Sequence, residues 1–159
     1  MTRQVLSTQV TPEEAFAGLL RAHATATRRF NAELVAEHGL TLSDYEVLLM
    51  LSLAPDRRMR RVDLAERSLL TQSGITRLLA GLEKAGFVER ASCASDGRVV
   101  YAQLTDAGLA KLRAASKTHL QGIQELFSSR FSAAELKTLA ALLGRLPTTR
   151  GDGACGPDE

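Results

Sequence analysis

Residues 71–104 read TQSGITRLLAGLEKAGFVERASCASDGRVVYAQL, and within them the spacing of apolar residues changes from that of a helix to that of a strand. Before Gly86, apolar residues recur at steps of three and four, at Ile75, Leu78, Leu79 and Leu82. After Gly86 they alternate, in residues 87–92 and again in 99–104, and Asp96-Gly97 between these runs is a tight-turn signal. The stretch therefore predicts a helix followed by a β-hairpin.

A short helix is predicted immediately before this stretch, over residues 62–69. Thr71 is a typical capping residue for the helix that carries Ile75. Two helices joined by so short a turn form a helix-turn-helix pattern. With the hairpin behind it, the pattern predicts a winged helix-turn-helix.

Longer helices are predicted on both sides of this unit. We expect, in order, a helix that ends at Gly39, a helix from Ser43 to about Leu53 that stops before Pro55, a long helix from Thr105, and a last helix from Ser132 to Leu146. The first carries a stripe that we expect to be buried: Phe16, Leu20, His23, Thr27, Phe30 and Leu34. A core of this size cannot cover the apolar faces of the first helix and the last two helices together, so we expect a second copy of the chain to cover them.

Three of the helix starts have the sequence of a capping box, in which a hydroxyl and a Glu three residues later satisfy each other's backbone amides. These are Thr11 with Glu14, Ser43 with Glu46, and Ser132 with Glu135. At two of them an apolar residue precedes the cap and another occupies the fourth helical position, which predicts a hydrophobic staple: Leu42 with Val47, and Phe131 with Leu136.

The expected fold is therefore mainly α with a small β-hairpin wing, a winged helix-turn-helix flanked by terminal dimerisation helices. We assign residues 1–40 to the N-terminal helix of the dimerisation region, 41–104 to the winged helix-turn-helix, and 105–146 to the C-terminal dimerisation helices. Residues 147–159 hold two Pro and three Gly, so we expect a disordered tail.

Composition excludes several classes of protein. The chain has 159 residues, of which 45% are hydrophobic and 24% charged, which is the usage of one globular domain. Its longest apolar runs, 47–51 and 139–143, are far shorter than a membrane span, and residues 1–12 lack the apolar core of a secretory signal. The cysteines, Cys93 and Cys155, form no disulfide framework, so we expect a cytoplasmic protein.

Charge is concentrated in the middle of the chain. Residues 57–98 hold nine basic and five acidic side chains, a net charge of +4, whereas the whole chain carries +2. Clustered arginines are commonly a solvated face, but a basic segment between slightly acidic ends also indicates a surface for a polyanion.

The helix that starts at Thr71 has no acidic residue before Glu83, so its N-terminus stays open to an anion. Its outward stripe is polar and basic, comprising Ser73, Thr76, Arg77, Ala80 and Lys84, and is slim enough for a major groove. The alternative is an ordinary amphipathic helix with a solvated face. We predict DNA contacts from Thr71, Gln72, Ser73, Thr76 and Arg77. At the wing, Asp96 can orient Arg98 toward a minor groove.

Several motifs in this order resemble the MarR family of bacterial winged-helix regulators. They are Asp63-Leu64-Ala65-Glu66-Arg67, Leu82-Glu83-Lys84-Ala85-Gly86, Asp96-Gly97-Arg98, and Leu104-Thr105-Asp106-Ala107-Gly108. The resemblance implies a homodimer that binds a pseudo-palindromic operator in double-stranded DNA, with the Thr71 helix in the major groove and the Arg98 wing in the minor groove. It also implies small, often aromatic or anionic effectors between the dimer helices and the winged domain. His23, Tyr45 and His119 are the candidate effector-pocket residues.

The function that fits best is a sequence-specific transcriptional regulator, a repressor rather than an activator. The alternative is a winged-helix module that binds protein and no specific DNA sequence. An enzyme is the weakest alternative, and we expect none, because the chain has no nucleophile elbow, no phosphate loop and no paired acid and base at catalytic spacing. The histidines lack metal-ligand spacing, so we expect no metal and no other cofactor. We interpret Cys93 as a small residue at a strand end, with a redox trigger beside the wing as the alternative.

Overall fold

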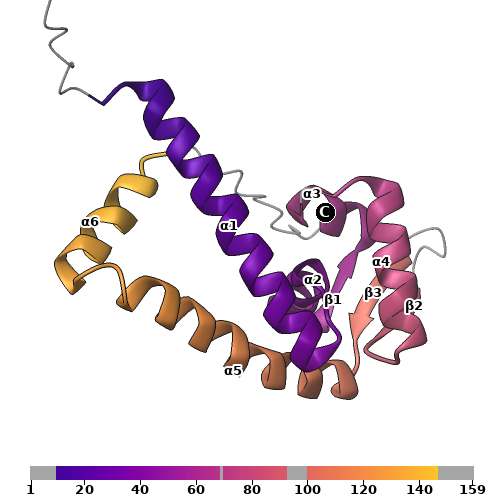
Figure 1. The fold of residues 1–159 in the computed structure, drawn as a ribbon. Coiled ribbons are helices and arrows are strands. Elements are labelled where there is room, and N and C mark those ends of the chain that lie inside the picture. The colour runs from indigo at the N-terminus through magenta and orange to yellow at the C-terminus, as the bar shows by residue number, and fades with distance from the viewer. Residues whose placement is uncertain (1–9, 69, 93–99, 147–159) are drawn as a thin grey trace, which may run out of the picture.

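The computed structural model describes residues 10–68, 70–92 and 100–146 and is predominantly helical (Figure 1). The predicted order of elements is confirmed. The helices are α1 (Pro12–His38), α2 (Leu42–Leu53), α3 (Arg61–Ser68), α4 (Gln72–Lys84), α5 (Asp106–Ser128) and α6 (Ala133–Leu143), and the strands are β1 (Arg58–Arg60), β2 (Val88–Ser92) and β3 (Val100–Leu104). A 3-10 turn, η1 (Pro55–Arg57), joins α2 to β1.

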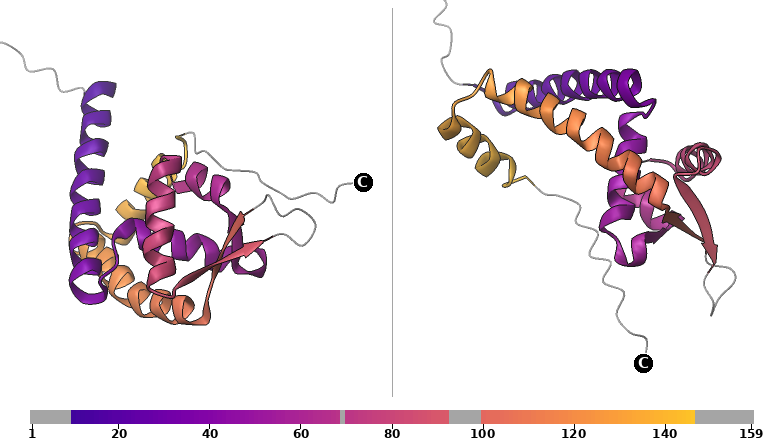
Figure 2. Two further views of the ribbon diagram at one scale, coloured as in Figure 1. Left: turned by 90° about the vertical axis from the view of Figure 1, so that its right-hand side faces the viewer. Right: turned by 90° about the horizontal axis from the view of Figure 1, so that it is seen from below.

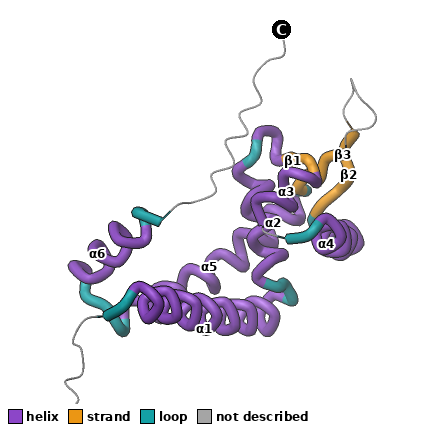
Figure 3. The backbone as a smooth tube through the Cα atoms, turned by 90° about the horizontal axis from the view of Figure 1, so that it is seen from above, coloured by secondary structure: helices purple, strands orange, loops and turns teal. Residues whose placement is uncertain are grey.

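The elements fall into two groups in space. The helices α2, α3 and α4 and the sheet form a compact unit, from which α1 and α5 project to one side (Figure 2). The helix α6 lies at the far end of α5, whereas α4 lies on the opposite side of the molecule (Figure 3). None of the described helices is long and apolar enough to span a membrane.

The wing is a three-stranded antiparallel sheet in the order β1-β3-β2, one strand more than the hairpin that we predicted. The additional strand pairs Met59 with Ala102, and both side chains are buried. It was missed because a strand of three residues has only one inward-facing residue and so cannot display the alternation that identifies strands. In the hairpin itself, Val88 pairs with Leu104 and Ser92 with Val100.

The capping boxes at Thr11 and Ser132 are confirmed, but the one predicted at Ser43 is wrong. The cap of α2 is Thr41, whose hydroxyl accepts from the Asp44 amide at 3.1 Å while Asp44 accepts from the Thr41 amide at 2.8 Å. Starting the helix two residues earlier lets the Leu42 amide donate to Asn31 of α1 at 3.0 Å. Leu42 is therefore the first residue of α2. It follows the cap instead of preceding it, so the hydrophobic staple predicted between Leu42 and Val47 is also wrong.

The core lies beneath α4 and is aliphatic. Its fully buried side chains are Leu34, Val47, Leu48, Leu51, Leu64, Ile75 and Leu79. From outside the winged unit it receives the C-terminal part of α1 and the first half of α5, through Leu34, Leu112 and Ala115. The winged unit, the C-terminal part of α1 and the first half of α5 thus share a single hydrophobic core.

The stripe on α1, which we expected to be buried throughout, is only half buried within one chain. Phe30 and Leu34 are buried, but Phe16 is 61% exposed and Leu20 is 52% exposed. An ion pair joins Arg29 of α1 to Glu125 of α5, and a hydrogen bond joins His38 of α1 to Thr118 of α5. Both α1 residues lie in the second half of that helix. The first half extends beyond the core, and α6 buries none of its residues against the described parts of the chain.

Candidate nucleic-acid interface

The helix α4 is fixed by one apolar face. Ile75, Leu79 and Leu82 are buried, as the period of the sequence predicts. At its start the Thr71 hydroxyl accepts from the Gly74 amide at 3.1 Å, which confirms the predicted cap. The first turn contains no acidic residue, so the positive end of the helix dipole is not neutralised there.

All five residues that we predicted to contact DNA from this helix are exposed: Thr71, Gln72, Ser73, Thr76 and Arg77. Ala80 and Lys84 continue the same exposed surface toward the C-terminus. The Thr76 hydroxyl donates to the Gln72 carbonyl at 2.8 Å, so its lone pairs and methyl group remain for a ligand. The helix therefore presents a polar and basic face without a carboxylate near its N-terminus.

Gly74 has a local role that the sequence did not suggest. A residue without a side chain at this position also permits the close approach of an anion to the start of the helix. In the structure a Cβ at this position would lie 3.1 Å from the Thr71 hydroxyl and 3.7 Å from the Leu70 Cβ. Gly74 therefore leaves room for the cap itself.

The wing residues that we predicted to contact DNA, Asp96 and Arg98, lie outside the described residues, as do Cys93 and Cys155. The strands that lead to the wing tip are described, and β2 and β3 extend from the C-terminal end of α4 (Figure 1). Both strands therefore belong to the unit that presents α4.

Much of the basic charge in residues 57–98 is paired within the chain. Ion pairs join Arg57 to Asp106 at 2.9 Å and Arg60 to Asp63 at 2.9 Å, and Arg58 lies 3.5 Å from Asp56. Counting charges along the sequence therefore overestimates the surface available to a polyanion. The basic residues of α4 lie apart from these pairs, because Arg77 and Lys84 point outward on its exposed face.

One carboxylate, Glu83 of α4, holds arginines from two other elements. Its Oε1 accepts from Arg61 Nη2 at the start of α3 at 2.7 Å, and its Oε2 lies 3.2 Å from Arg90 Nε on β2. The side chains of Arg61 and Glu83 are only 20% and 21% exposed. The charge pattern of the sequence predicts both arginines in a surface for a polyanion, whereas in the structure they connect α3 and the wing to α4.

We expect Glu83→Gln to lower the free energy of unfolding by about 1 to 3 kcal/mol, because it removes a charged acceptor from a largely buried guanidinium. Urea denaturation of the purified protein measures this change. Glu89→Gln on β2 is the control, because Glu89 is exposed and its substitution should cost less than about 0.5 kcal/mol. Equal losses in the two variants would contradict a special role for Glu83.

Of the three residues predicted to line an effector pocket, two are brought together. The Tyr45 and His119 rings lie 4.7 Å apart between centroids, and Phe30 packs edge-on against His119 at 5.1 Å. Phe30 was not among our candidates, although its place on the α1 stripe could have indicated it. His23 is instead exposed on α1, where it opposes the rise that burial causes in the pKa of Glu46.

The environment of His119 favours the neutral ring. Burial lowers the pKa of His119, and the charge of Glu33 only partly opposes this shift. Its Nδ1 is buried and has no hydrogen-bond partner among the described residues. Beside it, the Tyr45 hydroxyl is 3.3 Å from Ser116 Oγ. The cluster is thus aromatic with a few polar atoms, at the junction of α1, α2 and α5.

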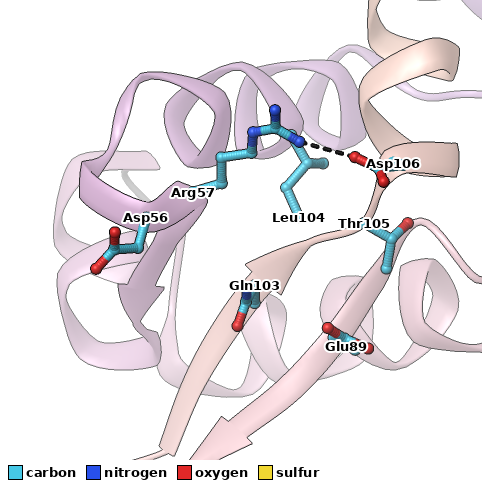
Figure 4. A pocket seen from close by; sticks show the side chains of 7 residues that line it. All are labelled: Asp56, Arg57, Glu89, Gln103, Leu104, Thr105 and Asp106. Carbon is cyan, nitrogen blue, oxygen red and sulfur yellow. Dashed lines mark hydrogen bonds and ion pairs between the residues drawn. The ribbon is translucent and has the colours of Figure 1, made fainter.

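A shallow depression of about 500 Å³ lies at the base of the wing, between η1, β2, β3 and the start of α5 (Figure 4). Asp56, Glu89 and Asp106 line it, and Arg57 pairs with Asp106 across its edge. Its lining holds three carboxylates and one arginine, a balance of charge that disfavours phosphate groups.

A helix-turn-helix followed by an antiparallel wing, with a second helix whose exposed face is polar and whose first turn has no acidic residue, defines the chain as a winged helix-turn-helix protein of the DNA-binding class. The sequence model described as the MarR family matches residues 38–99. The chain belongs to the MarR family of transcriptional regulators.

Named relatives support this membership. The transcriptional repressor YetL of Bacillus subtilis is 33% identical over 70% of this chain, an alignment that spans 66% of YetL and so just under two thirds of its length. Among solved structures, the MarR family regulator AbsC of Streptomyces coelicolor has a TM-score of 0.74 and 29% identity, covering 86% of this chain and 93% of AbsC. Sco3205 of the same organism, solved in complex with DNA, has a TM-score of 0.76 and 27% identity, covering 89% of both chains.

Proposed function

We propose that this protein is a sequence-specific repressor that binds a pseudo-palindromic operator as a homodimer. The observation that carries the proposal is the exposed face of α4, which is polar and basic and has no acidic residue in its first turn. The name of YetL as a repressor and the DNA complex of Sco3205 support the same function. In this proposal α4 enters the major groove.

The proposed wing contact comes from Asp96 and Arg98. An Arg suits the negative potential of a minor groove, and an Asp two residues away can orient the guanidinium. The strand β2, which precedes Asp96 and Arg98 in the chain, follows α4 after a short turn and so belongs to the unit that presents α4. A second contact at the wing supports binding of the duplex across two adjacent grooves.

The proposed dimer interface is formed by the terminal helices. Large apolar side chains are exposed on α1 at Phe16, Leu19 and Leu20, and on α6 at Leu142 and Leu143. Within the described chain α6 buries no residue, although its sequence is largely apolar. A symmetric partner that covers these faces supplies the burial that a single chain lacks. The proposed dimerisation region is thus residues 1–40 with 105–146, around a DNA-binding domain of residues 41–104.

The proposed effector is a small aromatic or anionic molecule near Tyr45 and His119. These rings lie where both long helices meet the winged unit, so a ligand that separates them would change the angle between the two groups of elements. The Nδ1 of His119, which has no hydrogen-bond partner among the described residues, offers a hydrogen bond to such a ligand. His23 joins the proposal only through its proximity to Glu46, one residue from Tyr45.

The experiment that tests the function is selection of bound fragments from random duplex DNA by the purified protein. We expect enrichment of an inverted repeat whose half-sites lie about one helical turn apart. A parallel selection with a variant that carries Gln72→Ala and Arg77→Ala serves as the control and should lose the repeat. Absence of any enriched sequence with the wild-type protein would favour the protein-interaction module instead.

A further inference from the structure

The end of α4 and the start of α5 meet in a small junction that lies away from the proposed DNA contacts. It consists of Gly86 and Phe87 in the turn after α4, and Thr105 and Gly108 at the start of α5. The Thr105 hydroxyl donates to the Gly86 carbonyl at 2.7 Å, and the Thr105 amide donates to the Phe87 carbonyl at 3.1 Å. The same hydroxyl accepts from the Gly108 amide at 3.0 Å. One side chain therefore caps α5 and attaches it to the turn that ends α4.

Gly108 allows the two backbones to touch. It is buried, and a Cβ built on it would overlap the Phe87 carbonyl oxygen and lie 2.7 Å from Leu104 Cδ1. A backbone oxygen held in a hydrogen bond cannot move aside as a flexible side chain can. On the other side of the junction Gly86 has a φ of 77°, the left-handed conformation that favours glycine. Both glycines are thus required by backbone geometry.

The turn is also fixed from the side of α4. The Phe87 amide donates to the Leu82 carbonyl at 3.0 Å, and Lys111 of α5 lies over the Phe87 ring at 5.8 Å. Hydrogen bonds and a close backbone contact therefore join α4 to α5 without a flexible connection. Since α5 leads to α6, the direction of α5 relative to α4 fixes where α4 lies relative to the terminal helices (Figure 3).

We infer that Thr105 and Gly108 are positioning residues that set the distance between the two α4 helices of the dimer, and hence the half-site spacing that the protein accepts. This inference rests on the proposed function as a homodimer on an inverted repeat. Neither residue needs to touch DNA, because both act through the Gly86-Phe87 turn. A displaced junction should leave the contacts of each α4 with its own half-site intact and should change the distance between the two α4 helices of the dimer.

The test compares Gly108→Ala, Thr105→Val and Thr105→Ser with the wild-type protein. Binding is measured to the selected operator, to operators with one base pair added to or removed from the spacer, and to a single half-site. Sedimentation and thermal unfolding monitor the dimer and its fold. Gly122→Ala is the matched control, the same change in the same helix, because the nearest atom to a Cβ there is the flexible end of Glu33 at 2.5 Å.

We expect the wild-type protein to prefer its native spacing by about tenfold or more, since one base pair rotates and shifts a half-site. Gly108→Ala and Thr105→Val should reduce that preference to about twofold or move it to another spacing, with half-site affinity changed by less than about twofold. Thr105→Ser, which keeps the hydroxyl, and Gly122→Ala should keep the wild-type preference. If Gly108→Ala does not fold, Thr105→Val with its serine rescue decides the question.

A folded, dimeric Gly108→Ala or Thr105→Val protein with the wild-type spacing preference would overturn the inference. An equal loss of affinity for the half-site and for every spacing would also overturn it, because that result indicates damage to α4 itself. A wild-type protein that is monomeric, or that binds operators of every spacing equally well, would refute the proposed binding of an operator by a dimer. This result depends on the wild-type protein alone, so it is distinguishable from a failure of the inference about Thr105 and Gly108.

Discussion

A chain that ends at Arg130 should be monomeric and should bind the operator at least about 100-fold more weakly than the full chain, because it can engage only one half-site at a time. The deletion removes α6 together with Phe131, Leu142 and Leu143, which are exposed in the single chain. Sedimentation measures the change in mass, and titration of labelled operator measures the affinity. Unfolding of the winged unit is not expected, because its buried core contains no residue of α6.

The control for this deletion is a chain that ends at Leu146. It keeps α6 and removes only residues 147–159, so we expect it to remain dimeric and to bind the operator as the full chain does. A monomer at this length would show that the last 13 residues take part in the interface. A dimer that persists in the chain ending at Arg130 would instead contradict the role of α6.

Substitutions on α4 and at the wing should separate sequence preference from general affinity. Changing Gln72, Ser73, Thr76 or Arg77 to Ala should alter which operator is preferred, at a cost of about 1 to 3 kcal/mol for each base edge that the side chain no longer reaches. Arg98→Ala should weaken binding to most duplexes and reduce the slope of log affinity against log salt by about one for each phosphate that a subunit no longer neutralises. The different outcomes follow from base edges carrying sequence information and phosphates carrying only charge.

The measurement is a titration of each variant against the selected operator, a variant half-site and an unrelated duplex at several salt concentrations. Glu89→Gln, on the carboxylate-lined side of the wing, is the reference that should bind as the wild type does. Variants of α4 that keep the wild-type preference, or an Arg98→Ala protein with unchanged affinity and salt slope, would contradict this division of roles. Either result would favour the alternative of a protein-interaction module.

Local features of the chain could be predicted from the sequence because they depend on residues within a few positions of one another. Thr71 caps α4 through an amide three residues away, and Ser132 and Glu135 close their capping box within one turn. The spacing of apolar residues changes at Gly86 from that of a helix to that of a strand. This change shows which residues face the core, and it is the reason why both the helix-turn-helix and the hairpin were predicted. The open start of α4 was predictable for the same reason, since it follows from the absence of an acidic residue in one turn.

Other features were decided only by tertiary structure, because they depend on which distant residues meet. The cap of α2 lies at Thr41 rather than Ser43, and with this start Asn31 of α1 accepts a hydrogen bond from the Leu42 amide. The strand β1 forms because β3 pairs with it, which places Met59 opposite Ala102. Arg61 and Arg90 converge on Glu83 although 29 positions separate them, so no local pattern could distinguish them from a DNA-facing surface.

The two levels meet at Leu104-Thr105-Asp106-Ala107-Gly108. The sequence identified this run as part of a family signature and as the start of a helix, which are local properties. Only the folded chain brings the Thr105 hydroxyl to the Gly86 carbonyl and the buried Gly108 against the Phe87 carbonyl. The sequence alone thus determined where α1, α4, α5 and α6 begin, through short-range hydrogen bonds and periodicity, whereas the position of α4 relative to α5 required contacts between backbones about 20 residues apart.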